Sequence, residues 1–377
     1  TVGAVILQKG TITGSSGVLI SSASFSFREG TVSAIIGGAS GITVTRIATN
    51  TAPDSVVLLT RDNTYAGVTA ITSGILRLGG AGGGTNTPLG TTGNGTTIAF
   101  GAALDLNGFT LGTAETITSL NGTGFGPSGS SNMGAIMNSS GTPVSYSGNI
   151  TMVAASRINA DYGALTFSGN LSGAFAFTSG GFSNSTYTGV IGSGALSVTK
   201  DGIGILTLSG DNSFTGAVTI SSGTLKLGAA GGATNTPLGT TAGITTVATG
   251  ARFDLNGYTL GTAEPLTLNG VGYGLGDFAS GALMNSSGSS VTYSGLLTLG
   301  ASASSTIKDD YGDINLTAAG TITGSSALFT LGGTGTGTLS SIIGTVAGTL
   351  TKINTGTWTL SGASTFTGAT RIDAGTL

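Results

Sequence analysis

The side chains with the clearest potential for chemistry are a few carboxylates. The 377 residues include no His and no Cys, which excludes an imidazole base, a cysteine nucleophile and the usual zinc sites. The densest acidic group is KDDYGD, where Asp309, Asp310 and Asp313 follow Lys308. Three carboxylates this close offer the oxygen ligands that Ca²⁺ prefers, although such a stretch is also typical of a solvated turn. Calcium is the one cofactor that these residues suggest; no other is expected.

A second set of acids occurs twice at one spacing. Asp105 and Glu115, in DLNG and GTAE, return as Asp254 and Glu264. Paired carboxylates could serve a polysaccharide lyase or glycosidase. The competing interpretation is structural, because Asp and Asn beside Gly hydrogen-bond the neighbouring backbone in turns. An acid that is written once per repeat favours the structural role, so no catalytic residue is predicted.

Three further patterns carry weaker signals. The glycine-rich stretches 79–90 and 228–239 precede neither a Lys-Ser/Thr pair nor a helix, so they do not predict a phosphate-binding loop. Thr-x-Thr pairs such as Thr11/Thr13 are typical of ice-binding faces only where they recur at every coil, which the spacing does not indicate. Some recurring aromatics could line a carbohydrate groove or pack in the core: Phe109/Tyr258, Tyr146/Tyr293 and Tyr162/Tyr311.

The composition excludes several classes of partner. Only 7% of the residues are charged, whereas soluble domains carry roughly 25%. Twelve Lys and Arg against fifteen Asp and Glu give a net charge of −3, which predicts neither a nucleic acid nor an anionic membrane as partner. Gly, Ser or Thr interrupts every apolar run before it reaches the roughly 18 residues of a membrane span. The 38% of hydrophobic residues nevertheless provide enough apolar surface for a folded core.

The elements that would position these residues are written in repeats. LDLNGFTLGTAE at 104–115 returns as FDLNGYTLGTAE at 253–264, a shift of 149 residues. The sequence therefore predicts internal units of about 150 residues, each built of several coils. Three segments of one continuous solenoid follow: a partial unit, 1–76, and two full units, 77–225 and 226–377.

Inside a unit the pattern is that of β-strands. Apolar residues alternate with Thr and Ser in short runs bounded by Gly and Asn-Gly turns, and no stretch has the period of a helix. Because the repeats run on without a point of closure and the strands are nearly uncharged, we expect a parallel β-helix with roughly 20–25 residues per coil. Residues that recur in register, such as Leu59, Leu208 and Leu360, would stack as inward ladders between like coils.

One segment carries a recognisable pattern. GILTLSGDNSFTGAVTISSGTLKL at 204–227 returns as GTWTLSGASTFTGATRIDAGTL at 356–377 and more loosely at 56–78. It resembles the autotransporter-associated β-strand repeat. Ten residues of the middle copy fall on the pattern: Gly204, Leu206, Leu208, Gly210, Asn212, Phe214, Gly216, Ile220, Gly223 and Leu225. We expect the Leu and Ile side chains among them to point inward and Gly210, Gly216 and Gly223 to turn the corners.

The third copy departs from the pattern at two positions. Trp358 stands in the place of Leu206, and Ser364 stands in the place of Asn212. The resemblance implies the right-handed β-helical passenger of a secreted surface protein from Gram-negative bacteria, located at the cell surface or outside the cell. It implies a scaffold and no catalytic residue.

These inferences predict a structural fibre or adhesin stalk. Neither end of the sequence resembles a cap, so we expect a piece of a longer chain, or subunits that contact one another end to end or laterally. Other partners would be surface glycans or other cells. One alternative is an adhesin whose glycan ligand binds loops that differ between the units, 122–133 and 271–280. The other is a β-helix lyase or glycosidase.

Overall fold

The structure is a computed structural model that describes residues 1–47, 55–125, 133–192, 194–274, 280–302, 304–324, 328–345 and 348–377. These residues form short strands joined by turns, and none of them lies in a helix. A helix long and apolar enough to cross a membrane is accordingly not found among them. The chain divides into two compact units, Thr1–Gly189 (unit 1) and Val190–Leu377 (unit 2).

Unit 1 contains the first part of the strand series. Its strands are β1 (Val5–Leu7), β2 (Thr11–Ile12), β3 (Val18–Ile20), β4 (Phe25–Phe27), β5 (Gly30–Val32), β6 (Ile35–Gly38), β7 (Ile42–Val44), β8 (Val56–Leu59), β9 (Thr64–Tyr65), β10 (Thr69–Ile71), β11 (Gly74–Leu78), β12 (Asn86–Thr87), β13 (Gly90–Thr91), β14 (Thr96–Ile98), β15 (Ala102–Asp105), β16 (Ile117–Gly122), β17 (Ile136–Asn138), β18 (Val144–Tyr146), β19 (Ile150–Ala160), β20 (Leu165–Phe167), β21 (Leu171–Ser172), β22 (Phe177–Gly180) and β23 (Ser185–Tyr187).

Unit 2 continues the series. Its strands are β24 (Ile191–Gly192), β25 (Val198–Lys200), β26 (Ile205–Leu208), β27 (Val218–Ile220), β28 (Thr224–Leu227), β29 (Thr245–Val247), β30 (Arg252–Asp254), β31 (Leu266–Leu268), β32 (Leu283–Met284), β33 (Val291–Tyr293), β34 (Leu297–Leu299), β35 (Ser304–Lys308), β36 (Ile314–Leu316), β37 (Thr321–Gly324), β38 (Leu328–Gly332), β39 (Thr336–Leu339), β40 (Ile342–Ile343), β41 (Thr349–Lys352), β42 (Thr357–Leu360) and β43 (Thr370–Ile372).

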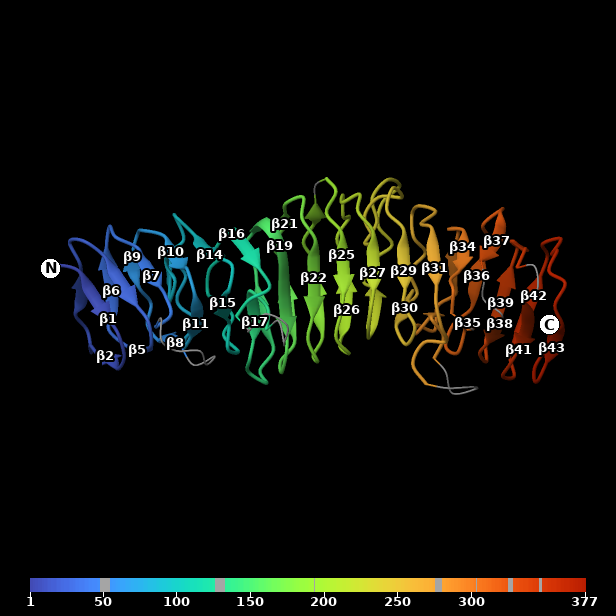
Figure 1. The fold of residues 1–377 in the computed structure, drawn as a ribbon, viewed down its shortest axis with the longest axis horizontal. Helices are drawn as coiled ribbons and strands as arrows, with labels where there is room; N and C mark the ends of the chain where they lie inside the picture. The colour runs from blue at the N-terminus through green and yellow to red at the C-terminus, as the bar shows by residue number, and fades with distance from the viewer. Residues whose placement is uncertain are drawn as a thin grey trace. The chain divides into compact units, whose positions relative to one another are not determined.

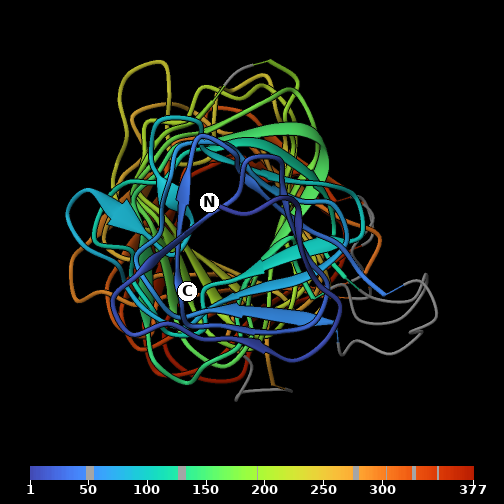
Figure 2. The ribbon, with the colours of Figure 1, turned by 90° about the vertical axis from the view of Figure 1, so that its left-hand side faces the viewer.

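Apart from the antiparallel pair β12–β13, the paired strands described run parallel to the strand one turn later. In unit 1, β18 pairs with β20 and β20 with β23, so that Val144, Leu165 and Ser185 lie in one row. In unit 2, β27, β29, β31 and β34 form a parallel series in the same way. Figure 1 shows the strands of each unit side by side, with the colour advancing from one strand to the next. Figure 2 shows the same ribbon with its N-terminal end facing the viewer. Each unit is therefore a parallel β-solenoid, as the alternation of the sequence predicts.

The structural repeat is the single turn. Turns contain about 21 residues, and in unit 1 the separation between paired strand residues varies from 17 positions (Phe25 and Ile42) to 34 (Gly122 and Ser156). The structural repeat of about 150 residues that the sequence predicts is not confirmed, because a parallel strand needs only the next turn as its partner. The segment boundaries at 76 and 225 stay predictions from the sequence.

The core consists of columns of apolar side chains, one from each successive turn. In unit 2, Ile220, Val247, Leu268 and Leu299 follow one another in register, and each is at most 1% exposed. The expected ladders therefore form between consecutive turns, at spacings of 21 to 31 residues in this column, and not between like coils about 150 residues apart. Burial of these columns supplies most of the stabilisation, at roughly 25 cal/mol for each Å² of apolar surface removed from water.

Glycine allows the turns to stack closely at one corner. In unit 1, a Cβ on Gly169 would lie 2.1 Å from the carbonyl oxygen of Gly148, and one on Gly189 would lie 2.2 Å from that of Gly169. In unit 2, a Cβ on Gly216 would lie 2.3 Å from the carbonyl oxygen of Leu196. The backbone of one turn thus rests directly on the next, and any side chain at these positions would push the turns apart.

Candidate functional site

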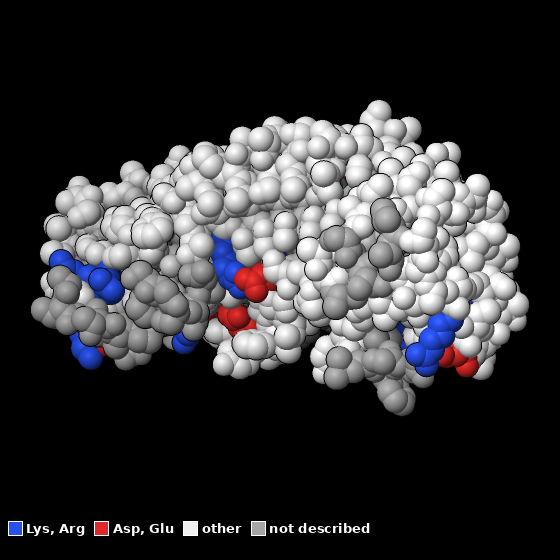
Figure 3. Space-filling view, turned by 45° about the vertical axis from the view of Figure 1, so that its right-hand side comes forward, with Lys and Arg blue, Asp and Glu red and all other residues white. Residues whose placement is uncertain are grey.

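The repeated aspartates lie in rows on the outer face of one sheet in each unit. In unit 1, Asp105 on β15 is in register with Arg77 on β11 and with Met137 on β17. In unit 2, Asp254 on β30 is in register with Lys226 on β28 and with Met284 on β32. We call these two rows the charged rows. Figure 3 shows charged side chains in a few small areas separated by uncharged surface.

All the acceptor capacity of Asp105 is used within the fold. Its Oδ1 accepts hydrogen bonds from the backbone N–H groups of Asn107 (3.0 Å) and Ser139 (3.1 Å). Its Oδ2 accepts bonds from the Ser139 hydroxyl (2.6 Å) and Arg77 Nε (2.7 Å). The side chain is fully buried. The carboxylate therefore joins three successive turns and has no free position for a substrate.

The charged row of unit 2 repeats this arrangement. Asp254 Oδ1 accepts the backbone N–H groups of Asn256 and Ser286, both at 2.9 Å, and its Oδ2 accepts the Ser286 hydroxyl at 2.6 Å. The cation is looser here, because Lys226 Nζ lies 3.8 Å from Asp254 Oδ2. The DLNG motif is thus a turn clamp that is written once in each unit.

The repeated glutamates are buried in the solenoid interior. Thr96 donates its hydroxyl to Glu115 Oε1 (3.2 Å), while Glu115 Oε2 has no hydrogen-bond partner within the described ranges. Burial raises the pKa of Glu115 to about 7 and also raises the pKa of Glu264. The described residues show no contact between Asp105 and Glu115, and both side chains are at most 1% exposed. This pair does not form an open acid–base site.

The KDDYGD stretch separates its three carboxylates into different surroundings. Asp310 lies 3.5 Å from Lys308 Nζ, and Asp313 Oδ1 accepts the backbone N–H of Thr336 at 2.8 Å. Asp309 is fully buried, and neither of its carboxyl oxygens has a hydrogen-bond partner in the part of the chain that the structure describes. No group of three or more acids in that part is arranged to hold a metal ion. Calcium at these residues stays a prediction.

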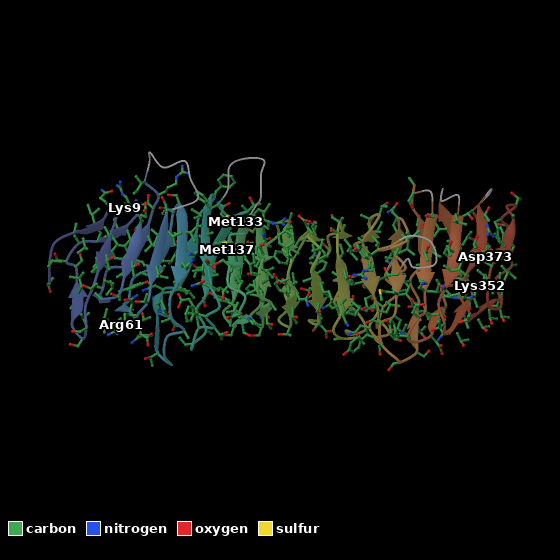
Figure 4. The ribbon with its side chains drawn as sticks, turned by 90° about the horizontal axis from the view of Figure 1, so that it is seen from below. Lys9, Arg61, Met133, Met137, Lys352 and Asp373 are labelled. Atoms are coloured by element: carbon green, nitrogen blue, oxygen red, sulfur yellow. The ribbon has the colours of Figure 1, made fainter. Side chains whose placement is uncertain are left out.

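Buried lysines were missed by the sequence reasoning. Lys352 (labelled in Figure 4) is fully buried, and its Nζ donates to the carbonyl oxygens of Ile353 (2.6 Å), Asn354 (2.8 Å) and Ala374 (3.4 Å). Lys200 Nζ likewise donates to the carbonyls of the two residues that follow it, Asp201 (2.9 Å) and Gly202 (2.7 Å). It also donates to the carbonyl of Ser222 in the next turn (3.3 Å). The signal in the sequence was a lysine four residues before Gly204 and Gly356 in two copies of the repeat.

The asparagine of the repeat connects three turns. Asn212 accepts the backbone N–H of Ile191 at 2.7 Å and donates to the carbonyl of Pro237 at 2.7 Å. Asn63 makes the corresponding bonds in unit 1, to Ile36 and Pro88, at 2.8 and 2.7 Å. In the third copy Ser364 keeps only the first of these bonds, from the N–H of Ile343 at 3.2 Å. The stretch TNTPLG, which occurs at 85–90 and again at 234–239, is therefore a loop that closes over the repeat.

The other residues of the repeat are structural. Its large apolar residues are fully buried: Leu206, Leu208, Phe214, Ile220 and Leu225. Gly223 adopts a left-handed backbone with φ 69°, as a corner residue can. Gly216 instead serves the close stacking described above, and Gly210 is a buried residue without positive φ.

The aromatic pairs divide between core and surface. Tyr146 and Tyr293 are buried and donate their hydroxyls to the carbonyls of Glu115 (2.6 Å) and Glu264 (2.7 Å). Phe109 and Tyr258 are half-buried. Tyr162 and Tyr311 are exposed by 73% and 69%. The loops 122–133 and 271–280, which carry the adhesin alternative, lie partly outside the described residues, at 126–132 and 275–279.

A column of threonines occupies the outer face of one sheet in unit 2. Thr219, Thr246, Thr267 and Thr298 are consecutive in register, contrary to the expectation that no ladder would recur at every coil. Each turn contributes a strand of three residues whose middle position faces outward, and Thr suits such a position. A second outward threonine column beside it is not found among the described residues, because Ile244 and Leu296 stand two positions before Thr246 and Thr298.

The fold and these sites define a class before any family is considered. Parallel pairing from turn to turn, inward apolar columns and close glycine corners make each unit a parallel β-solenoid. The family model described as the passenger-associated-transport-repeat matches the chain at residues 56–78, 198–227 and 350–377. The resemblance of 204–227 and its copies to an autotransporter passenger repeat is thereby confirmed. Comparisons with curated proteins and with solved structures found no match.

Proposed function

We propose that the chain is the scaffold of a secreted surface protein, a structural fibre or adhesin stalk within an autotransporter passenger. In this proposal the solenoid is right-handed, the producing cell is a Gram-negative bacterium, and the protein acts outside that cell or on its surface. The observation that carries the proposal is the turn-by-turn parallel pairing in a chain with three passenger repeats. Such a stack provides reach and rigidity.

The forces that hold the turns together suit such a role. Backbone hydrogen bonds run from each turn to the next, and apolar columns fill the interior. Ion pairs are scarce in the described residues, and exposed ones such as Lys9–Glu29 contribute little. Because salt screens charges but leaves backbone ladders and apolar burial in place, the scaffold should tolerate changes of ionic strength outside a cell.

The same chemistry suits contacts with further copies of the chain. A sheet edge that exposes unpaired N–H and C=O groups can accept another strand, so we include end-to-end or lateral self-association in the proposal. Surface glycans or other cells are the second class of partner. The proposal includes neither a nucleic-acid partner nor a membrane span within these residues.

Electron microscopy of the purified chain tests the fibre. We expect rods or filaments whose width matches one solenoid, and compact isolated particles without rods would overturn the proposal. Measurement of sedimentation at several concentrations distinguishes single rods from end-to-end assemblies.

An adhesin with a specific glycan ligand is a second candidate. Three tyrosines with mostly exposed rings favour it, since sugars stack on such rings: Tyr162, Tyr273 and Tyr311. Arg252 lies over the Tyr273 ring at 5.9 Å. We expect a glycan array to show binding that Tyr273→Ala weakens and Tyr258→Ala does not.

The lyase or glycosidase alternative has less support. The acids that recur between units are buried, and the open hollow of about 330 Å³ in unit 1 is lined by Ile35, Thr60, Arg61 and Asp62, which include only one carboxylate. An assay for unsaturated or reducing ends on acidic polysaccharides would decide it. Turnover that Asp62→Asn abolishes would favour the enzyme over the scaffold.

A further inference from the structure

The sequence contains a chemically sensitive dipeptide at several positions. Five Asn residues are followed directly by Gly: Asn94, Asn107, Asn121, Asn256 and Asn269. An Asn–Gly pair can lose ammonia because glycine has no side chain to hinder its own backbone nitrogen when that nitrogen attacks the Asn side-chain carbon. The reaction requires the glycine nitrogen and the Asn side chain to be free to meet. The structure provides this freedom unequally.

The pairs in the two turn clamps are held at both reacting groups. Gly108 donates its N–H to Asn138 Oδ1 at 3.0 Å, and the Asn107 side chain donates to the carbonyl of Leu78 at 2.9 Å. Asn107 also has the left-handed backbone, with φ 48°. The attacking nitrogen is thus tied to the next turn while the side chain under attack is tied to the previous one.

The corresponding pair in unit 2 is held by the same bonds. Gly257 donates to Asn285 Oδ1 at 2.9 Å, and Asn256 donates to the carbonyl of Leu227 at 2.8 Å. Because both acceptors of the glycine N–H groups are buried asparagines, release would require the turns to separate.

Two further pairs are protected by other means. Gly270 donates its N–H to the carbonyl of Ser304 at 2.9 Å and to the Ser302 hydroxyl at 2.8 Å. Asn121 and Gly122 end β16, where Gly122 is in register with Ser156 of β19, while the pairing of β16 with β14 ends at Leu120. We expect ring closure here to require the end of the β16–β19 ladder to open.

Asn94–Gly95 differs from these four. It lies in the turn between β13 and β14, and Asn94 is exposed. The carbonyl of Gly95 accepts the N–H of Thr69 at 3.2 Å. For the N–H of Gly95, in contrast, no acceptor is found within the described ranges. Among the described residues, the Asn94 side chain makes a single hydrogen bond, from its Nδ2 to the carbonyl of Ala66 at the surface.

We propose that Asn94 is a site of spontaneous deamidation, and that the fold confines this reaction to it among the five pairs. The Gly95 nitrogen loses its proton and attacks Asn94 Cγ, so that an N–C bond forms. The Cγ–Nδ2 bond then breaks, and ammonia leaves with that proton. Water opens the resulting succinimide at one of its two carbonyls and yields either aspartate or isoaspartate.

The modification changes the contact between neighbouring turns. The net reaction adds one negative charge to a chain whose formal net charge is −3. It also removes the Nδ2 donor and brings a carboxylate toward the Ala66 carbonyl oxygen, where two acceptors face one another. We therefore expect the turn at 92–95 to loosen from the turn below after conversion.

Mass spectrometry of the native chain, incubated at pH 8 and digested at acidic pH, measures the reaction at each site. Labelling with an isoaspartate methyltransferase detects the isomer. The same chain in concentrated urea gives the rate of each pair without protection. We expect the native rate at Asn94 to stay within about tenfold of its urea rate, and the other four sites to be slowed by at least about a hundredfold.

Two variants sharpen the test. Asn94→Gln, whose longer side chain closes a ring slowly, should abolish the new charge variant. Asn138→Ala frees the N–H of Gly108 and should raise the rate at Asn107 at least about tenfold, with circular dichroism to verify the fold. The comparison of native and urea rates does not depend on either variant. Equal protection at all five sites, or faster conversion at Asn107 or Asn256 than at Asn94, would overturn the proposal.

Discussion

The two charged rows share their centre and differ at one end. Asp105 and Asp254 make the same bonds to the following serine and asparagine. Beyond the methionine, the row of unit 1 continues with Asn159 on β19, and that of unit 2 with Lys308 on β35. The next residue is a buried Ala160 in unit 1 and a buried Asp309 in unit 2.

This difference shows what the solenoid interior accepts. The same place along the turn holds a methyl group in one unit and a carboxyl group without hydrogen-bond partners in the other. Burial raises the pKa of Asp309 to about 7, and the neighbouring Asp313 and Asp310 act in the same direction, whereas its own backbone N–H and Lys352 act against it. A buried acid is thus tolerated as the neutral form. The clamps, in contrast, supply hydrogen-bond donors to both oxygens of their carboxylates.

Removal of the clamp carboxylates is expected to have the largest effect. Asp105→Ala leaves the N–H groups of Asn107 and Ser139 and the Arg77 guanidinium without their acceptor, so we expect a loss of about 3–5 kcal/mol in the free energy of unfolding. Asp254→Ala should cost less, about 2–3 kcal/mol, because its cation is more distant. Urea unfolding measures both values. The exposed Asp373→Ala is the control, and equal losses for all three would contradict the comparison.

Exchange of the differing residue should transfer the pH dependence between units. The folded-state pKa of Asp309 lies above the unfolded value of 3.8, so the folded state binds more protons and its stability falls as pH rises from about 4 to about 7. Asp309→Ala should therefore stabilise the chain by about 2–4 kcal/mol at pH 8 and change little at pH 4. Urea unfolding at both pH values checks this.

The reciprocal variant completes the exchange. Ala160→Asp should destabilise unit 1 more at pH 8 than at pH 4. The difference between the two pH values should be similar in size to that expected for Asp309→Ala. If Asp309→Ala stabilises equally at both pH values, then ionisation of Asp309 is not the cause.

The buried glutamates should show the same sign in both units with a smaller effect. The pKa of Glu115 is raised from 4.5 to about 7, so its contribution also turns unfavourable as pH rises through that range. Glu115→Gln keeps the bond from Thr96 and removes the charge. We expect a gain of about 1–3 kcal/mol at pH 8 and almost none at pH 4. A loss of stability at pH 8 would mean that the ionised form is the one the interior holds.

The smallest effect concerns the asparagine of the repeat. Asn212→Ser copies the third repeat into the second and leaves the carbonyl of Pro237 without its donor, at a cost of about 1–2 kcal/mol. Ser364→Ala removes a single bond and should cost about 0.5–1 kcal/mol. Thermal unfolding compares the two. The interpretation of Asn212 as a connector fails if the order is reversed.

Much of this architecture can be predicted from the sequence. Alternation of apolar residues with Thr and Ser indicates the strands, and the copies around Leu206 and Leu208 indicate a stacked repeat, because both are local patterns. The length of a turn is not a local property. The loops between paired strands have different lengths, so the predicted 20–25 residues per coil agrees with the average turn of about 21 but does not give the length of any single turn.

The polar interior could be predicted only in part. Asp105 and Asp254 were recognised as turn residues from the Asn-Gly that follows them. The burial of Lys352 was not foreseen, because a lysine normally marks the surface. Its acceptors are carbonyls that the turn brings together, and a carbonyl leaves no trace in the identity of a residue. The close approach at Gly216 was likewise hidden, since a glycine that turns a corner and one that lies under a neighbouring backbone read alike.

The unequal length of the turns separates two dimensions of the molecule. Successive strands in unit 1 remain one hydrogen bond apart whether the chain spends 17 or 34 residues on the way round. The spacing between stacked strands is therefore set by the backbone hydrogen bonds, while the length of the loop in each turn can vary. Peptides inserted into a long turn should project from the solenoid without altering that spacing, so insertions in successive turns would be displayed at fixed intervals.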